Sequence, residues 1–134
     1  MPEQFLEQRF AALAAGDFAG VYDSYHEDAP FRGHFPERDM YVRFAEEQLA
    51  GIKVIRWCCL DRRMPAENNM ECLLVSWLEV DGEEQLFYEL ALLLMTEQGW
   101  RYHSAQKLGI DDYRGAPERI RFEHFDDAPE KIRF

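Results

Sequence analysis

Apolar residues in the first fifty positions recur with the spacing of α-helices. A first helix is predicted over about residues 5–15, where Gly16 ends it, and Asp17 is a typical N-cap for a second helix that closes at residues 26–28. The apolar positions are Leu6, Phe10 and Leu13 in the first helix and Phe18, Val21, Tyr22 and Tyr25 in the second. Residues 29–31 are expected to be extended and residues 32–36 to form a loop. A third helix is predicted over residues 37–50.

From residue 52 onward the pattern changes to that of β-strands. Strands are predicted over residues 52–60, 70–80, 85–96 and 100–108, with a polar turn over 62–69 and a hairpin at Asp81-Gly82. Helices followed by an antiparallel meander indicate an α+β fold. We therefore expect three N-terminal helices packed on a curved antiparallel sheet of four or more strands.

The strand at 85–96 is apolar on both faces, and we expect one face to meet the helices and the other a second sheet. This predicts a homodimer formed through the sheet. The chain then divides into a domain over residues 1–108 and an extension over 109–134. The extension repeats one pattern after twelve residues, at 116–122 and 128–134, and its apolar residues predict that it docks on this chain or a neighbour.

Composition narrows the functional classes. The chain has 26 acidic against 15 basic residues, a net charge of −11, so it has no general attraction to nucleic acid. No apolar run is long enough to cross a membrane, and no leader is apparent at the start. The three cysteines, Cys58, Cys59 and Cys72, are interpreted as buried free thiols, which fits a cytoplasmic location.

Three segments resemble the nuclear transport factor 2-like superfamily, which has a cystatin-like cone fold. They are residues 10–17 (Phe-Ala-Ala-Leu-Ala-Ala-Gly-Asp), the Val21-Tyr22 pair and residues 27–31 (Glu-Asp-Ala-Pro-Phe). The Asp-Gly hairpin and residues 99–102 (Gly-Trp-Arg-Tyr) agree with the final strands of that fold. The resemblance covers about residues 5–108 and implies a curved sheet around a long helix, an apolar pocket and often a homodimer.

Ketosteroid isomerase belongs to the same superfamily, and its catalytic roles can be compared with this chain. Alignment on the Ala-Gly-Asp junction places Arg9 where the tyrosine donor belongs and Gly33 where the aspartate base belongs. Leu93 falls near the second aspartate. All three roles are lost, so the resemblance does not imply a steroid isomerase.

Arg9 and Glu89 are the polar residues whose positions stand out most. Arg9 shares the apolar side of the first helix, where a guanidinium needs an anion or a route to water. Glu89 interrupts an apolar strand, so its carboxylate is either paired, with Arg9, Arg56 or Arg101, or has a raised pKa suited to acid–base chemistry. Both alternatives stay open at the level of the sequence.

The histidines offer weaker candidates. His26 and Asp28, with His34 nearby, resemble a two-histidine, one-carboxylate metal site, but the match is poor. A favourable contact of His26 with the C-terminal end of a helix is the simpler interpretation. His34 lies next to Gly33 and could carry a proton at a pocket mouth. His103 in the last strand is interpreted as a hydrogen-bonded sheet residue. We expect no metal and no cofactor, because no phosphate loop, nucleophile elbow or zinc spacing is present.

Three functional hypotheses remain. The first is a homodimeric or ligand-binding module that takes a small apolar or anionic molecule. The second is a cofactor-free lyase, isomerase or cyclase that uses Glu89 and His34 as acid and base. The third is an interaction protein that works through its extension. The expected ligand-binding residues are Arg9, Tyr22, Tyr25, Phe31, Trp57, Glu89 and His103. Loss of the isomerase roles favours the first hypothesis and argues against an enzyme.

Overall fold

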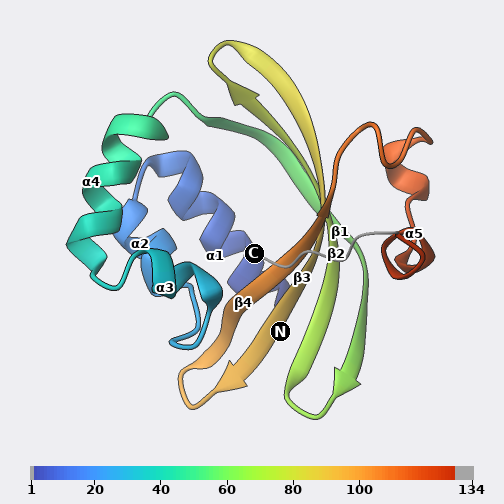
Figure 1. The fold of residues 1–134 in the computed structure, drawn as a ribbon, viewed down its shortest axis with the longest axis horizontal. Helices are drawn as coiled ribbons and strands as arrows, with labels where there is room; N and C mark the ends of the chain where they lie inside the picture. The colour runs from blue at the N-terminus through green and yellow to red at the C-terminus, as the bar shows by residue number, and fades with distance from the viewer. Residues whose placement is uncertain (1, 129–134) are drawn as a thin grey trace.

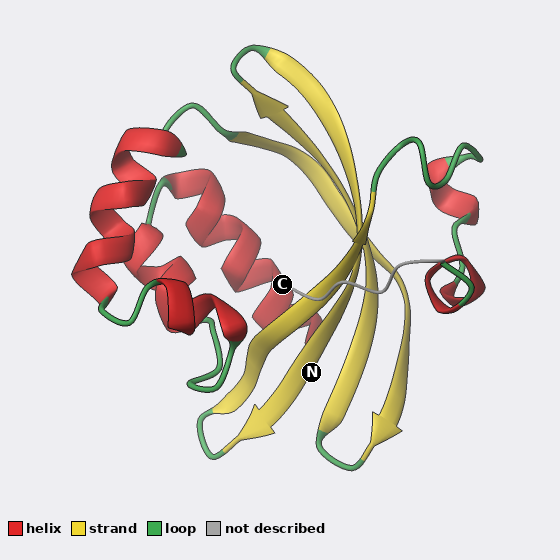
Figure 2. Ribbon diagram, in the orientation of Figure 1, coloured by secondary structure: helices red, strands yellow, loops and turns green. Residues whose placement is uncertain are grey.

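Four N-terminal helices line one face of a strongly bent antiparallel sheet in the computed structural model, which describes residues 2–128 (Figure 1). The helices are α1 (Pro2–Ala15), α2 (Phe18–Asp23), α3 (Pro30–His34) and α4 (Arg38–Gln48). The sheet has the order β1 (Lys53–Ala66), β2 (Asn69–Val80), β3 (Glu83–Thr96) and β4 (Gly99–Leu108). A 3₁₀ turn, η1 (Pro117–Arg119), and a short helix, α5 (Phe122–Asp126), lie on the opposite face of the sheet (Figure 2). The predicted α+β fold is confirmed.

The junction between α1 and α2 forms as the sequence predicts. Gly16 has a φ of +71°, a left-handed conformation that costs glycine little, and the chain can therefore leave α1 sharply. The Asp17 side chain accepts a hydrogen bond from the Gly20 amide at 3.0 Å and caps the start of α2. Leu6 and Phe10 of α1 are buried against the sheet.

The segment after α2 differs from the prediction. Helix α2 ends at Asp23, and Tyr25 instead forms a parallel bridge to Tyr102 at the edge of β4. The Tyr102 amide donates to the Ser24 carbonyl, and the His26 amide donates to the Tyr102 carbonyl, both at 2.8 Å. These bonds to β4 replace those of further helical turns. Pro30, expected in an extended segment, begins the short α3, because proline is well suited to the first position of a helix.

The strands follow the predicted order, but β1 is longer than expected. It continues through the charged residues of the predicted turn to Ala66, so the turn is confined to Glu67 and Asn68. Asn68 has a φ of +62°, and Asp81 and Gly82 have φ values of +52° and +83°, as tight hairpins require. The pairing of β1 with β2 shifts register at three places, between Val54 and Arg56, between Cys59 and Asp61, and between Arg63 and Ala66. Such irregularities let an edge strand bend with the sheet.

One apolar cluster joins the inner face of the sheet to α1, and a second cluster holds the helices together. One is centred on Leu6 and Phe10, and the Phe10 ring stacks on Trp57 with centroids 4.7 Å apart. The other joins α2 and α4 through Phe18, Val21, Tyr22, Tyr41 and Ala45. The helices and the inner face of the sheet do not pack completely, and a cavity remains between them.

The outer face of the sheet is covered by residues of the extension, where we had expected a second sheet. Tyr88 and Leu90 of β3 pack against Tyr113, Ile120 and Phe125 in one buried cluster. Ile120 and Phe125 are completely buried. The expectation of a second sheet on this part of β3 is therefore wrong, because the chain covers it with its own apolar residues. Of the second copy of the repeat, residues 129–134 lie outside the described part of the chain.

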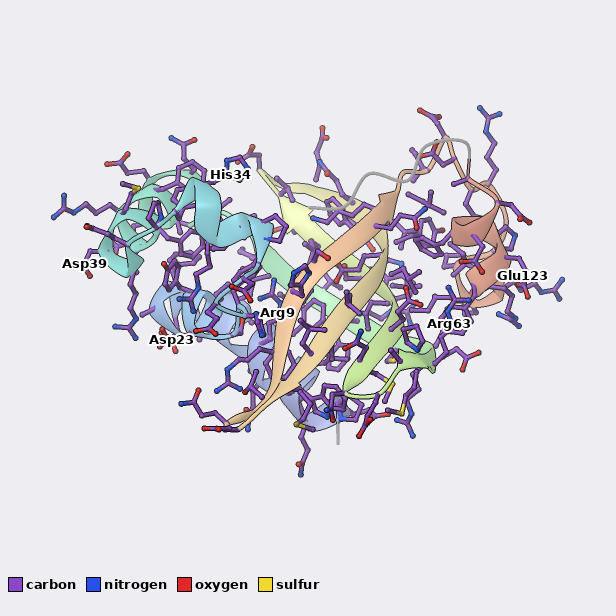
Figure 3. The ribbon with its side chains drawn as sticks, turned by 60° about the horizontal axis from the view of Figure 1, so that its bottom comes forward. Arg9, Asp23, His34, Asp39, Arg63 and Glu123 are labelled. Atoms are coloured by element: carbon purple, nitrogen blue, oxygen red, sulfur yellow. The ribbon has the colours of Figure 1, made fainter. Side chains whose placement is uncertain are left out.

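A charged cluster holds the extension to the sheet. Arg63 donates to both carboxylate oxygens of Asp126, at 3.0 and 2.8 Å, and to Glu71 at 2.9 Å. Its guanidinium also lies 4.3 Å from the centre of the Phe122 ring, and Gln106 donates to the Phe125 carbonyl at 2.8 Å. Arg63 thus joins β1, β2 and α5, and Figure 3 shows it on the side of the sheet that carries α5.

The three cysteines are free, but only Cys72 is fully buried, whereas Cys58 and Cys59 are half-buried. Cys58 packs with the outer cluster and Cys59 with the inner one, as adjacent strand residues must. No helix in residues 2–128 is both long and apolar enough to cross a membrane.

Candidate functional site

A cavity of about 320 Å³ lies between the helices and the inner face of the sheet. Helices α1, α2 and α4 supply one wall, and β2, β3 and β4 supply the other. Its lining is mostly apolar and comprises Phe10, Leu13, Val21, Leu49, Ile52, Leu78, Val80, Phe87 and Leu108, with Arg9, Tyr25, Tyr41, Ser76, Tyr88, Glu89 and Lys107 as the polar members. The volume is at the lower end of the usual range for small-molecule sites, about 300–1,000 Å³.

Arg9 projects from α1 toward the sheet, and Figure 3 shows it near the centre of the molecule. It donates to Ser24 Oγ at 2.5 Å and to the Tyr25 hydroxyl at 3.0 Å. Its guanidinium carbon lies 4.5 Å from the centre of the Tyr25 ring and 4.0 Å from that of Tyr102. Burial alone would lower the pKa of Arg9, but Tyr25, Tyr102 and Glu89 more than offset this, and the pKa lies above its ordinary value. Arg9 is therefore a fixed positive charge.

Glu89 lies on β3 and is half-buried at the cavity wall. One of its carboxylate oxygens accepts a hydrogen bond from the Tyr102 hydroxyl at 3.2 Å. Burial, and then the charge of Glu89, raise the pKa of Tyr102 well above its ordinary value, so the phenol stays protonated and can donate. Tyr102 thus lies between the cation of Arg9 and the anion of Glu89, and we refer to Arg9, Tyr25, Glu89 and Tyr102 as the polar floor.

The structure shows where Glu89 lies relative to the arginines that were considered as its partners. No arginine lies within 4.0 Å of its carboxylate among the described residues, so the structure shows no direct salt bridge to Arg9, Arg56 or Arg101. Arg56 is instead on the outer face, 3.8 Å from the centre of the Trp77 ring, and Arg101 donates to backbone carbonyls. A carboxylate that faces a mostly apolar cavity and is bonded to a phenol remains available for contact with a ligand.

Three of the seven expected ligand-binding residues, Arg9, Tyr25 and Glu89, come together at the cavity. Tyr22, Phe31 and Trp57, which were also expected to bind the ligand, are not part of the cavity lining. Tyr22 is buried in the helical cluster and donates to the Phe35 carbonyl at 2.8 Å. Phe31 stacks on Tyr25, with the two ring centroids 3.9 Å apart, and so holds the Tyr25 ring in place. Trp57 packs on Phe10, which itself lines the cavity.

The histidines also lie away from the cavity. His34 is exposed on α3, because residues 30–34 form a helix that turns it outward, and Figure 3 shows it remote from Arg9. His26 Nδ1 accepts from the Asp28 amide at 3.0 Å, and the His26 and His103 rings are 6.0 Å apart. His103 contacts Ser104 at 2.9 Å. Within residues 2–128, no group of three or more histidine, cysteine or acidic side chains is arranged to hold a metal ion.

Several lining residues were missed by the sequence analysis. Phe87 shares the face of Glu89 by simple alternation along β3, and Ser76 lies opposite Phe87 on β2, so both follow from the strand pattern. Lys107 could not be found in this way. An irregularity at His103 shifts the pairing of β3 with β4, and Lys107 rather than Gln106 lies opposite Glu89.

Comparison with known proteins bears on the fold. No protein-family model matches the chain, and no curated protein matches it in sequence. Among solved structures, it is similar to a domain of unknown function with a cystatin-like fold from Nostoc punctiforme. The TM-score is 0.60 at 16% sequence identity, over 93% of this chain and 83% of the other. The cystatin-like cone fold that the resemblance implied is thus confirmed.

Proposed function

We propose that this chain binds a small, mostly apolar molecule in the cavity, with the polar end of that molecule directed to the polar floor. The observation that carries the proposal is a cation and a carboxylate, Arg9 and Glu89, that both line a mostly apolar space of about 320 Å³. Charged groups are costly to withdraw from water, and an apolar void forgoes packing energy. A ligand with an apolar body and one polar end offsets both costs.

Titration with indole and 2-naphthol, followed by amide NMR spectra, tests this proposal. Both probes are uncharged bicyclic molecules that carry one polar group. We expect saturable shifts at Phe10, Val21 and Phe87, with dissociation constants of about 1 mM or less. The variant Leu78→Trp places a larger side chain in the cavity wall and should weaken binding at least about tenfold.

Leu94→Trp is the matched control, because Leu94 is also half-buried in the sheet but is absent from the cavity lining. It should bind both probes as the original chain does. Absence of saturable shifts, or equal loss of binding in the two variants, would contradict the proposal.

A cofactor-free enzyme is the second candidate, and one observation favours it. Glu89 lines the cavity, where a general base must lie to reach a bound substrate, and the hydrogen bond from Tyr102 orients its carboxylate. His34 has no part in this version, since it is exposed on α3. The reaction would begin with transfer of a proton from an activated carbon of the ligand to Glu89.

Proton exchange of 2-tetralone, an enolisable bicyclic ketone, tests the enzymatic candidate in deuterated water. Acceleration by the protein that Glu89→Gln abolishes and Glu84→Gln preserves would support catalysis, because Glu84 is exposed on the same strand. An exchange rate that is the same with and without protein would leave binding as the function.

We also retain the homodimer as a proposal, although the apolar outer face of β3 no longer supports it. The extension already covers Tyr88 and Leu90, so a dimer through the sheet would have to use the remaining outer surface or displace the extension. A cytoplasmic location fits the free cysteines and remains a proposal as well.

A further inference from the structure

We propose that the polar end of the ligand is a neutral group that both accepts and donates hydrogen bonds, of which a carboxamide is the simplest example. This inference rests on the proposed function, because it specifies the ligand of the same cavity. In the bound state a ligand carbonyl would accept from Arg9, and the adjacent N–H would donate to Glu89.

The charges of the polar floor support a neutral group. Arg9 contributes one positive charge and Glu89 one negative charge, and both line the same cavity. Within the described residues neither has an oppositely charged partner inside 4.0 Å, although the Glu89 charge does act on Arg9. Lys107 also lines the cavity but is exposed, so water screens its charge more strongly.

A charged ligand would disturb this balance. A carboxylate placed against Arg9 would bring a second negative charge beside Glu89, and an ammonium group placed against Glu89 would face Arg9. Near apolar walls like charges repel more strongly than they do in water, and a buried charge that lacks its own partner is costly. A neutral donor–acceptor group avoids both penalties.

Both floor residues also retain hydrogen-bonding capacity. A guanidinium has five N–H donors, and the Arg9 side chain uses donors to Ser24 and Tyr25 in the structure. Glu89 accepts from Tyr102 through Oε2, while a carboxylate can accept several bonds. Arg9 therefore has donors, and Glu89 acceptor sites, beyond those used in these bonds, which is what a carboxamide requires.

The floor is held in place before a ligand arrives. Arg9 lies against the rings of Tyr25 and Tyr102, and Tyr25 is itself stacked on Phe31 with centroids 3.9 Å apart. The backbone of Tyr102 is bonded on both sides to residues 24 and 26. Side chains fixed in this way lose little freedom on binding, which favours a selective site.

Three compounds with the same apolar body test the inference. They are naphthalene-2-carboxamide, 2-naphthoate and 2-naphthylmethylammonium, titrated at neutral pH by calorimetry. The original chain should bind the amide about tenfold more tightly than either ion. Glu89→Gln leaves the floor with a net positive charge and should make 2-naphthoate the tightest ligand. Arg9→Gln leaves a net negative charge and should make the ammonium compound the tightest.

Glu84→Gln is the matched control and should keep the original order of affinities, because Glu84 is exposed and lies outside the cavity lining. Circular dichroism confirms that each variant is folded. Should Arg9→Gln fail to fold, the Glu89→Gln titration decides alone, since one reversal of preference is sufficient.

The outcomes separate this inference from the proposed function. If the naphthalene compounds bind but the original chain prefers an ion, or if Glu89→Gln does not change the order, the inference is wrong and the binding function stands. If none of the three binds and indole and 2-naphthol also fail to bind, the proposed function itself is wrong.

Discussion

The two faces of the sheet are built from alternate residues of the same strands, yet they are covered in different ways. On the inner face, helices α1, α2 and α4 leave a cavity of about 320 Å³ beside Glu89. On the outer face, Ile120 and Phe125 of the extension are buried completely against Leu90 and its neighbours. The helices span the bent sheet as rigid cylinders, whereas the short, irregular extension follows the sheet surface closely.

This difference separates the parts that stabilise the fold from those that provide a site. Contacts on the outer face are close-packed, so their loss should reduce stability strongly. Residues that line the cavity border empty space, so their truncation should cost less and should instead alter ligand binding. The predictions below test this contrast in order of decreasing effect.

Removal of residues 109–134 should have the largest effect. It exposes Leu73, Val75, Tyr88 and Leu90 together, and a contiguous apolar surface of this kind promotes self-association. We expect the shortened chain to unfold at markedly lower denaturant concentration and to associate as its concentration rises. Light scattering and denaturant titration measure both changes.

The intact chain is the control for that experiment, and its mass also tests the proposed homodimer. A monomer at micromolar concentration would contradict the dimer. An unchanged mass and unchanged unfolding midpoint after truncation would contradict the stabilising role of the extension.

Phe125→Ala should cost about 3 kcal/mol of unfolding free energy, because a fully buried aromatic side chain is removed. Leu78→Ala is the paired variant on the inner face, and it should cost only about 1 kcal/mol because Leu78 is half-buried and borders the cavity. Chemical denaturation measures both values. Equal costs would remove the distinction between the two faces.

Arg63→Met should destabilise the chain by about 2 kcal/mol, because Glu71, whose side chain is only 8% exposed, loses its salt bridge with Arg63. The double variant Arg63→Met/Glu71→Gln should recover part of this loss. Arg38→Met is the control, since the pair of Arg38 with Asp23 is about half exposed and water screens it, so its loss should have much less effect than the loss of Arg63. A similar loss in both single variants would argue against special importance for Arg63.

The last effect is absent at neutral pH and appears only at alkaline pH. Burial raises the pKa of Tyr41 from 10.0 to about 12. The unfolded chain therefore releases this proton at lower pH than the folded chain, so the stability contribution is full below pH 10 and is lost as pH rises toward about 12. Tyr41→Phe keeps the ring and should lose stability less steeply over that range. Thermal unfolding at successive pH values measures the two slopes, and identical slopes would contradict the assignment.

Much of the secondary structure could be predicted because its signals are local. Gly16 and Asp17 specify the break between α1 and α2, and Asp81-Gly82 specifies a tight hairpin. Local signals failed where distant contacts compete with them. Tyr25 has helical spacing from Val21 and Tyr22, but the backbone of residues 24–26 bonds to β4 instead. The charged end of β1 resembles a turn, but there Arg63 bonds to Glu71 and Asp126.

The residues of the site also divide into those that local signals could predict and those that depend on contacts between distant segments. Glu89 could be singled out because a carboxylate within an apolar strand is conspicuous, and Arg9 because it shares the apolar side of a helix. Their joint position at one cavity depends on how α1 crosses the sheet. His34 was a reasonable candidate by proximity in sequence to Gly33, but the helical turn of α3 leaves it exposed.

The amino-acid sequence by itself determined the order of elements, the sharp turns and the alternation that assigns each strand residue to one face, because these depend on backbone preferences and hydrophobic period. Only the tertiary structure decided which face meets which partner. One extra residue at His103 directs Lys107 toward the cavity and Gln106 toward Phe125, and no local signal marks it. The pairing of strands across a bend is settled by the packing on both sides, so register and cavity arise together.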